Sequence, residues 1–357
     1  MMASKSSAIL RRALLYGTLF AYVPATSIDF FSTTPQYRPD KKPANARKRN
    51  AVPASSPRML TKSLGLTSDN VTYDLEDSVT PTAKPQARTA LREHLANLLS
   101  RPSTIRELAV RINAVETSFA LDDLTALAKL PQVDAIVIPK VNSASDLTFV
   151  TDALRHLAPE RHPSPSAPNP IKLIALIESA RAVMDLSSIC AASPYLSGLI
   201  FAAEDFALDM SLTRTPSLSE FLYARSAIAT AARAASLPST IDLVCTSYKG
   251  EEGLARLEEE CRGGKAMGFN GKQCIHPSQV EMVQRLFAPG EKEVEWAVRV
   301  VIADEKAATA GRGAWTLDGA MIDAPVVGKA KAVVAKAQGC GIDVEKLMSK
   351  WKNQEPE

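Results

Sequence analysis

Short apolar runs alternate with longer amphipathic segments along most of the chain from residue 70 onward. Each run has the length of a buried β-strand, and each intervening segment has the apolar spacing of a helix. Strands and helices that alternate at this spacing predict parallel βα units. The predicted strands are 70–76, 108–113, 135–140, 173–177, 199–203, 240–245 and 272–276. The predicted helices are 82–100, 119–129, 145–157, 182–192, 220–236, 251–267 and 278–287.

One more strand is predicted near the N-terminus, over residues 10–16. Residues 17–51 then interrupt the pattern with Pro24, Pro35, Pro39, Pro43 and a basic run, a composition typical of a loop or a disordered segment. If this interval is left out, ALLY continues directly into VPASS, so we expect 17–51 to be an insertion outside the fold. Eight βα repeats, without a GxGxxG or P-loop motif, predict a TIM (β/α)8 barrel rather than an open doubly wound sheet.

The pattern divides the chain into three regions. Residues 1–51 hold the start of the first strand and the predicted insertion, residues 52–290 form the barrel, and residues 291–357 form a C-terminal helix and arm. The arm contains the Gly-rich stretch GRGAWTLDGAMIDAP. A segment of this kind, left over once a barrel is closed, is typical of a lid.

Composition and charge exclude several other classes of protein. The chain has a formal net charge of +3 and 46% hydrophobic residues, with no basic stripe beyond residues 38–49 and no apolar run long enough to span a membrane. We therefore expect neither nucleic acid nor a membrane as a partner. The 5 cysteines are far apart and form no CxxC pair, which predicts a reducing compartment, mitochondrial or cytoplasmic, and no structural zinc.

Two of the predicted strands end at acidic residues. Glu178 follows the run 173–177, and Glu204 and Asp205 follow the run 199–203. The carboxyl ends of parallel strands meet at one rim of a barrel, so Glu178 and Asp205 are predicted to converge on a hard cation such as Mg²⁺. The alternative is that each acid only caps the helix that follows it. Glu204 points to the other side and is left out of the metal site.

The remaining strand ends are also polar. Arg111 has two roles that the sequence leaves open: an ion-pair partner of the acids in DLED, or a cation that holds a developing enolate or carboxylate oxygen. Lys140 is predicted to anchor an anionic substrate rather than to form a Schiff base. His276 is either a hydrogen-bonded strand-end residue or a proton carrier. The predicted polar ring comprises Asp74, Glu76, Asp77, Arg111, Asn113, Lys140, Glu178, Glu204, Asp205 and His276.

Motifs at these strand ends, taken in order, resemble one known family. They are similar to the citrate lyase β-subunit-like (CitE-like) proteins of the HpcH/HpaI aldolase and malyl-CoA lyase group. The resemblance covers residues 10–16 and 52–340. The motifs are DLEDSV (74–79), RIN (111–113), IPKV (138–141), ALIESA (175–180), FAAEDF (201–206), GKQCIHPSQV (271–280) and GAMIDAP (319–325).

The resemblance implies a TIM barrel, often trimeric, that uses Mg²⁺ to make or break a C–C bond between an acyl-CoA thioester and a 2-oxo acid. Carried over by motif, Glu178 and Asp205 are the metal ligands, and Arg111 binds the substrate and stabilises the thioester enolate. Glu76 and Asp77 then lie near a metal-bound water and Arg111.

The resemblance also implies a role for the arm. In the malyl-CoA lyase branch the aspartate of the MID motif, here Asp323, reaches in from a neighbouring subunit and takes part in proton transfer. The expected substrate is a 3-hydroxyacyl-CoA of the malyl-CoA or citramalyl-CoA type, with hydrolysis of the thioester left open. Three alternatives remain: a citrate lyase β-type subunit acting on a carrier-protein thioester, a CoA-independent 2-oxo acid aldolase, and a catalytically silent barrel that serves as a scaffold.

Overall fold

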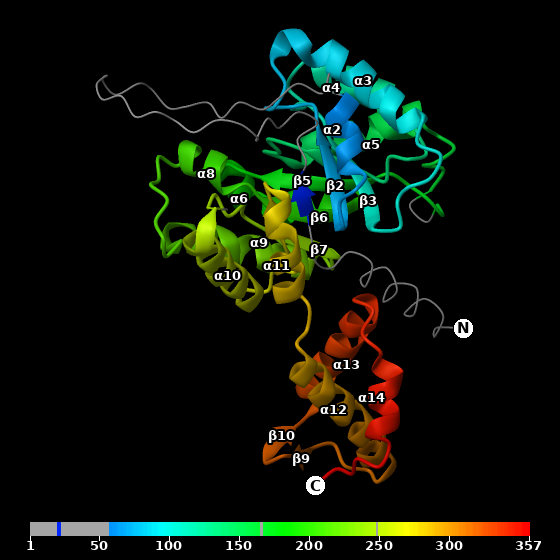
Figure 1. The fold of residues 1–357 in the computed structure, drawn as a ribbon, viewed down its shortest axis with the longest axis vertical. Helices are drawn as coiled ribbons and strands as arrows, with labels where there is room; N and C mark the ends of the chain where they lie inside the picture. The colour runs from blue at the N-terminus through cyan, green and yellow to red at the C-terminus, as the bar shows by residue number, and fades with distance from the viewer. Residues whose placement is uncertain (1–19, 23–56, 165–166, 248) are drawn as a thin grey trace.

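Eight parallel strands close into a barrel in the order of the sequence, with helices around the outside (Figure 1). The computed structural model describes residues 20–22, 57–164, 167–247 and 249–357. The barrel confirms the predicted TIM fold. Its strands are β1 (Phe20–Tyr22), β2 (Ser68–Asp74), β3 (Ile105–Arg111), β4 (Ala135–Ile138), β5 (Lys172–Ile177), β6 (Leu196–Phe201), β7 (Ser239–Asp242) and β8 (Gly271–Cys274).

The helices around the barrel lie close to the predicted segments. The predicted helix at 182–192 is divided in two at Asp185, and a short helix that the pattern did not indicate, α8, follows β6 directly. The helices are α2 (Pro57–Ser63), α3 (Lys84–Ala96), α4 (Phe119–Leu127), α5 (Ala144–Leu157), α6 (Ala180–Met184), α7 (Leu186–Ala191), α8 (Ala203–Asp209), α9 (Leu222–Ala234), α10 (Gly250–Ala266) and α11 (Val280–Phe287), with the 3₁₀ turns η1 (Pro81–Ala83), η2 (Ser219–Phe221) and η3 (Pro277–Gln279).

The first strand differs from the prediction. β1 pairs in parallel with β2 and with β8 through residues 20–22, which lie inside the interval 17–51 that we expected to be looped out. For these residues the prediction was wrong, because the aromatic run FAY also favours a strand. The predicted strand at 10–16 and the rest of the interval lie outside the described residues.

The interior of the barrel is small and apolar at mid-height. Residues paired in register across neighbouring strands share a face of the sheet, and the alternation along each strand places every second residue inside. This interior layer is separate from the larger core between the sheet and the helices. Its members are Ala109, Ala135, Val137, Ile174, Leu176, Ile200 and Ile241.

Residues 291–357 form a C-terminal unit with its own apolar core, which includes Val298, Trp315 and Val334. Figure 1 shows this unit as a lobe beside the barrel, joined to it through the segment after α11. In the described part of the chain, no helix is both long and apolar enough to cross a membrane. The elements of the unit are α12 (Glu291–Thr309), β9 (Trp315–Leu317), β10 (Ala320–Ile322), α13 (Ala324–Gly339) and α14 (Val344–Lys350).

A polar pair lies inside the barrel, below the apolar layer. Glu107 on β3 is paired in register with Asn70 on β2, and its Oε2 accepts a hydrogen bond from Asn70 Nδ2 at 2.8 Å. Glu107 is in the alternation of Ala109 and Arg111, so its carboxyl points into the barrel. Burial raises the pKa of Glu107 to about 7. The carboxyl is therefore predominantly protonated in mildly acidic solution.

This shift predicts a pH dependence of stability. Because the folded-state pKa of Glu107 lies above its unfolded value, the native state binds the extra proton, and stability falls as the pH rises from about 4.5 to about 7. Glu107→Gln removes this dependence, which amounts to about 3 kcal/mol. Urea unfolding of both proteins at pH 5 and pH 8 measures the difference. Parallel pH profiles for the two proteins would contradict the assignment.

Candidate functional site

Two carboxylates stand at the same rim of the barrel, after neighbouring strands. Glu178 directly follows β5, and Asp205 lies in the first turn of α8, which begins two residues after β6 ends. Ile177 and Phe201, the last residues of these strands, are paired in register. The two predicted metal ligands are therefore brought to adjacent positions at the carboxyl end of the sheet, where α/β barrels carry their active sites.

These carboxylates are placed where their charge is poorly tolerated. Glu178 is buried, and burial together with the neighbouring Asp205 carboxylate raises the pKa of Glu178 to about 8. Burial and the charge of Glu76 raise the pKa of Asp205 as well. The backbone N–H of Lys140 donates a hydrogen bond to the Glu178 carboxyl. Two such oxygen donors fit a hard divalent cation, which would neutralise both charges.

The number of donors also bears on the kind of cation. Among the described residues, no group of three or more His, Cys, Asp or Glu side chains gathers in a way that could hold a metal. Mg²⁺ is commonly bound through one or two carboxylates, with waters and substrate oxygens completing the octahedron. Glu178 and Asp205 suit this mode rather than a closed site built from protein ligands alone.

Arg111 is the cation at the centre of the rim. Its guanidinium makes a bidentate pair with Asp74, with Nε and one terminal nitrogen each 2.7 Å from a carboxylate oxygen. The other terminal nitrogen lies 3.0 Å from Glu76 Oε2 and 3.8 Å from Asp77 Oδ2. Asp74 is fully buried and also accepts from the backbone N–H groups of Glu76 and Ser78. Arg111 is thus an ion-pair partner of the DLED acids, held in a fixed orientation.

The side chain of Lys140 contacts the segment 74–79, which carries the DLED acids and is called the acid loop below. Its ammonium is 3.1 Å from Glu76 Oε1 and 3.9 Å from Asp77 Oδ1. Burial alone would lower the pKa of Lys140, but the carboxylates of Glu76, Asp77 and Glu178 outweigh it and raise the pKa. The amine therefore stays charged, which fits an electrostatic role and disfavours a Schiff base.

The backbone of Lys140 is also unusual. Its φ of 52° is in the left-handed region, which a residue with a Cβ rarely adopts. This conformation directs the N–H of Lys140 to the Glu178 carboxyl while the side chain extends to Glu76. Backbone strain of this kind at a strand end is typical of a functional site.

Three other predicted residues lie apart from this cluster. Glu204 accepts a hydrogen bond from Arg214 at 2.6 Å. His276 accepts from the N–H of Ser278 at 3.2 Å and caps η3, which is a structural role. Asp323 caps α13 by accepting from the N–H of Val326 at 3.2 Å. Among the described residues, no hydrogen bond or ion pair joins Asp323 to the barrel rim.

Lys84 was not predicted from the sequence as part of this site. Lys84, at the start of α3, is buried and donates to the carbonyl oxygens of Leu75 and Glu76 at 3.1 and 2.9 Å and to Asn113 Oδ1. Asn113 in turn donates to the buried carboxylate of Asp123. Lys84 thus fixes the backbone of the acid loop at Leu75 and Glu76. The sequence signal was a lysine in the first turn after a polar loop, which does not distinguish it from a surface lysine.

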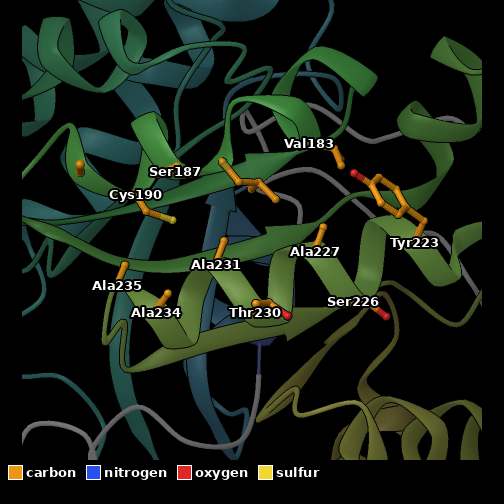
Figure 2. A pocket seen from close by; sticks show the side chains of 12 residues that line it. Val183, Ser187, Cys190, Tyr223, Ser226, Ala227, Thr230, Ala231, Ala234 and Ala235 are labelled. Atoms are coloured by element: carbon orange, nitrogen blue, oxygen red, sulfur yellow. The ribbon is translucent and has the colours of Figure 1, made fainter.

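A hollow of the described surface lies away from these residues. A groove of about 790 Å³ runs between α7 and α9, and Figure 2 shows its side chains facing one another from the two helices. No charged residue lines it, so it offers no donors for a cation. Its lining residues are Val183, Leu186, Ser187, Cys190, Ala191, Tyr223, Ser226, Ala227, Thr230, Ala231, Ala234 and Ala235.

Comparison with known proteins agrees with the arrangement at the rim. Residues 51–277 match the family described as HpcH/HpaI aldolase/citrate lyase. The chain belongs to this family. The match covers more than half of the chain and includes the segments that carry Asp74, Arg111, Glu178 and Asp205. The predicted family, and with it a lyase rather than a silent scaffold, is thereby confirmed.

Members of the HpcH/HpaI family with named activities align with most of the chain. The citrate lyase subunit beta of Haemophilus influenzae is 34% identical over 80% of this chain and 95% of its own length. The (3S)-malyl-CoA thioesterase of Cereibacter sphaeroides is 33% identical, with 80% and 93% covered. The mitochondrial citramalyl-CoA lyase of Homo sapiens is 30% identical, with 80% and 84% covered.

Solved structures of the family share the fold. The structure of CitE from Mycobacterium tuberculosis in complex with magnesium, acetoacetate and coenzyme A has a TM-score of 0.63 and 28% identity, covering 90% of this chain and 98% of that chain. The citrate lyase beta subunit of the same organism, complexed with oxaloacetate and magnesium, has a TM-score of 0.55 and 26% identity, covering 78% and 100%.

The position of Lys84 predicts a loss of stability on its replacement. Lys84→Met keeps the aliphatic stem but leaves the carbonyls of Leu75 and Glu76 without this donor, so the free energy of unfolding should fall by about 2–3 kcal/mol. The exposed Lys129 gives a matched control, since Lys129→Met should change stability by less than about 0.5 kcal/mol. Chemical denaturation measures the free energy of unfolding of both variants. Equal stability of the two variants would contradict a stabilising role of the Lys84 hydrogen bonds.

Proposed function

We propose that this chain is a Mg²⁺-dependent carbon–carbon lyase that cleaves or forms a 3-hydroxyacyl-CoA of the malyl-CoA or citramalyl-CoA type. The partners in the reverse direction are an acyl-CoA and a 2-oxo acid. The observation that carries the proposal is a pair of carboxylates at the rim, the buried Glu178 and the half-buried Asp205, near a guanidinium fixed by Asp74. The names of the malyl-CoA and citramalyl-CoA relatives support this substrate class.

Glu178 and Asp205 would hold the cation. Their raised pKa values indicate two carboxyl groups that a divalent ion at this rim would favour in the charged form. Bound Mg²⁺ would supply Lewis-acid polarisation of the carbonyl of the 2-oxo acid. The magnesium complexes of the two solved CitE-type structures support the same choice of ion.

Arg111 would hold the oxygen of the thioester as it becomes an enolate. Its orientation is already set by the bidentate contact with Asp74, so little reorganisation accompanies the reaction. Glu76 contacts both Arg111 and Lys140 and would keep the two cations in place. Lys140 would attract the carboxylate of the 2-oxo acid.

Asp323 would act as the base that removes the α-proton of the acyl-CoA. Within one chain it lies in the C-terminal unit and caps α13. We therefore propose that a neighbouring subunit of a homo-oligomer, a trimer by family resemblance, supplies Asp323 to each barrel. The exposed Met321, two residues before it on β10, leaves this hairpin with apolar surface that a neighbouring subunit could cover.

A citrate lyase β-type subunit, acting on a carrier-protein thioester, is the second candidate. The 34% identity to the Haemophilus influenzae subunit favours it. Both candidates use the same rim and differ in the group that carries the thioester, so a substrate assay separates them.

The substrate proposal is tested by turnover of defined thioesters. Purified protein with Mg²⁺ is incubated with malyl-CoA, citramalyl-CoA and a citryl thioester on a carrier protein, and the released 2-oxo acid is measured. We expect turnover of at least one CoA thioester, its loss in EDTA and its return with added Mg²⁺. Turnover of the carrier-bound substrate alone would favour the second candidate, and no turnover with any substrate would reject the lyase proposal.

The origin of Asp323 is tested by subunit complementation. Asp323→Ala and Glu178→Gln should each abolish turnover, the first without loss of metal binding. If Asp323 comes from a neighbour, co-expression of the two inactive chains rebuilds about a quarter of the sites, because random mixing supplies an intact barrel and an intact neighbour together in that share.

The control is the same two chains purified separately and mixed without subunit exchange, which should stay inactive. Co-expressed chains that remain inactive while forming mixed oligomers would show that Asp323 acts within its own chain or not at all.

A further inference from the structure

Arg214 ties the loop after α8 to two other elements. Its Nη1 lies 2.6 Å from Glu204 Oε1 in the first turn of α8, and its Nη2 lies 2.9 Å from Glu260 Oε1 on α10. The same Nη2 donates to the carbonyl oxygen of Val244 at 3.0 Å, just after β7. Only 17% of the Arg214 side chain is exposed. One guanidinium therefore links α8, α10 and the end of a barrel strand.

Glu260, one of the two carboxylates that Arg214 contacts, is itself held by a buried lysine. Glu260 is buried, and its Oε2 lies 3.0 Å from the ammonium of Lys272 on β8, which is completely buried. Charges of alternating sign thus run in a row from β8 to the first turn of α8, through Lys272, Glu260, Arg214 and Glu204. The inner part of this row, from Lys272 to Arg214, is poorly hydrated, which strongly favours one arrangement of its charges.

The loop that carries Arg214 is itself held. The N–H and the hydroxyl of Thr215 donate to the Glu220 carboxylate at 2.6 and 2.7 Å. Arg256 on α10 donates to the carbonyl oxygen of Pro216 at 2.6 Å. Arg214 is therefore presented to Glu204 from a loop with little freedom of its own.

Glu204 and Asp205 are consecutive residues of the short helix α8, so an anchor on one limits the orientation of the other. We propose that Arg214 is a positioning residue for Asp205, acting through Glu204. This inference rests on the metal role of Asp205 proposed above. Glu204 is half exposed, and an ion pair of that kind adds little to stability. The Arg214–Glu204 ion pair matters because it fixes the orientation of the Asp205 carboxylate.

The test measures metal binding directly, with Mn²⁺ as a spectroscopic probe and no substrate. Arg214→Gln should weaken Mn²⁺ binding about 10–100-fold, the range seen when a group that orients a metal ligand is removed. Arg214→Lys should restore part of the affinity. Glu204→Gln should weaken binding to a similar degree, and the double variant should be no worse than either single variant, because both act through one contact.

Arg225 provides the matched control. It makes a buried bidentate pair with Asp242, at 3.0 and 2.7 Å, between α9 and β7. Arg225→Gln should lower the thermal midpoint while changing the Mn²⁺ dissociation constant by less than about twofold. Comparing Arg225→Gln with Arg214→Gln separates a loss of overall stability from a loss of the contact that orients the Asp205 carboxylate.

The outcomes distinguish this inference from the proposed function. Asp205→Asn must lose Mn²⁺ binding that the wild type shows, and equal binding by both would overturn the metal role of Asp205 and the inference with it. If Asp205→Asn loses the ion while Arg214→Gln and Glu204→Gln bind it like the wild type, the positioning role is rejected and the metal site stands. Should Arg214→Gln fail to fold, Arg214→Lys and Glu204→Gln still decide the question.

Discussion

Several carboxylates gather at one end of the barrel, and the guanidinium of Arg111 is the charge on which this gathering depends. Burial raises the pKa of Glu76, Glu178 and Asp205, so the rim resists holding negative charge. Arg111 compensates on one side by binding Asp74 and Glu76. On the other side, the charge of Arg111 also favours the ionised forms of Glu178 and Asp205, but burial outweighs it and the pKa of both carboxyl groups stays raised. The rim thus divides into a part that the protein neutralises itself and a part suited to a cation.

Much of this division could be predicted from the sequence. In a parallel barrel every strand ends at the same rim, so a residue that follows an apolar run is placed there without knowledge of distant contacts. On this basis Arg111, Glu178 and Asp205 were expected at one rim, and the structure places all three there. Glu204 was expected to point elsewhere, and it contacts Arg214.

Positions that depend on long-range packing could not be predicted in this way. The first strand has three residues, and local composition does not decide which of several short apolar runs pairs with β2 and β8. Lys84 reaches Asn113, 29 residues away, and Arg214 reaches Glu260, 46 residues away. Both resemble ordinary surface cations in sequence, since neither their charge nor their neighbours in the chain indicate burial.

The position of Lys140 requires both a left-handed backbone and a positively charged side chain. Glycine adopts the left-handed backbone conformation with the least strain, because it has no Cβ. Glycine, however, has no side-chain amine to contact Glu76 and Asp77. Asparagine tolerates the conformation but carries no charge. No standard side chain satisfies both requirements without strain, so this position has few acceptable substitutions.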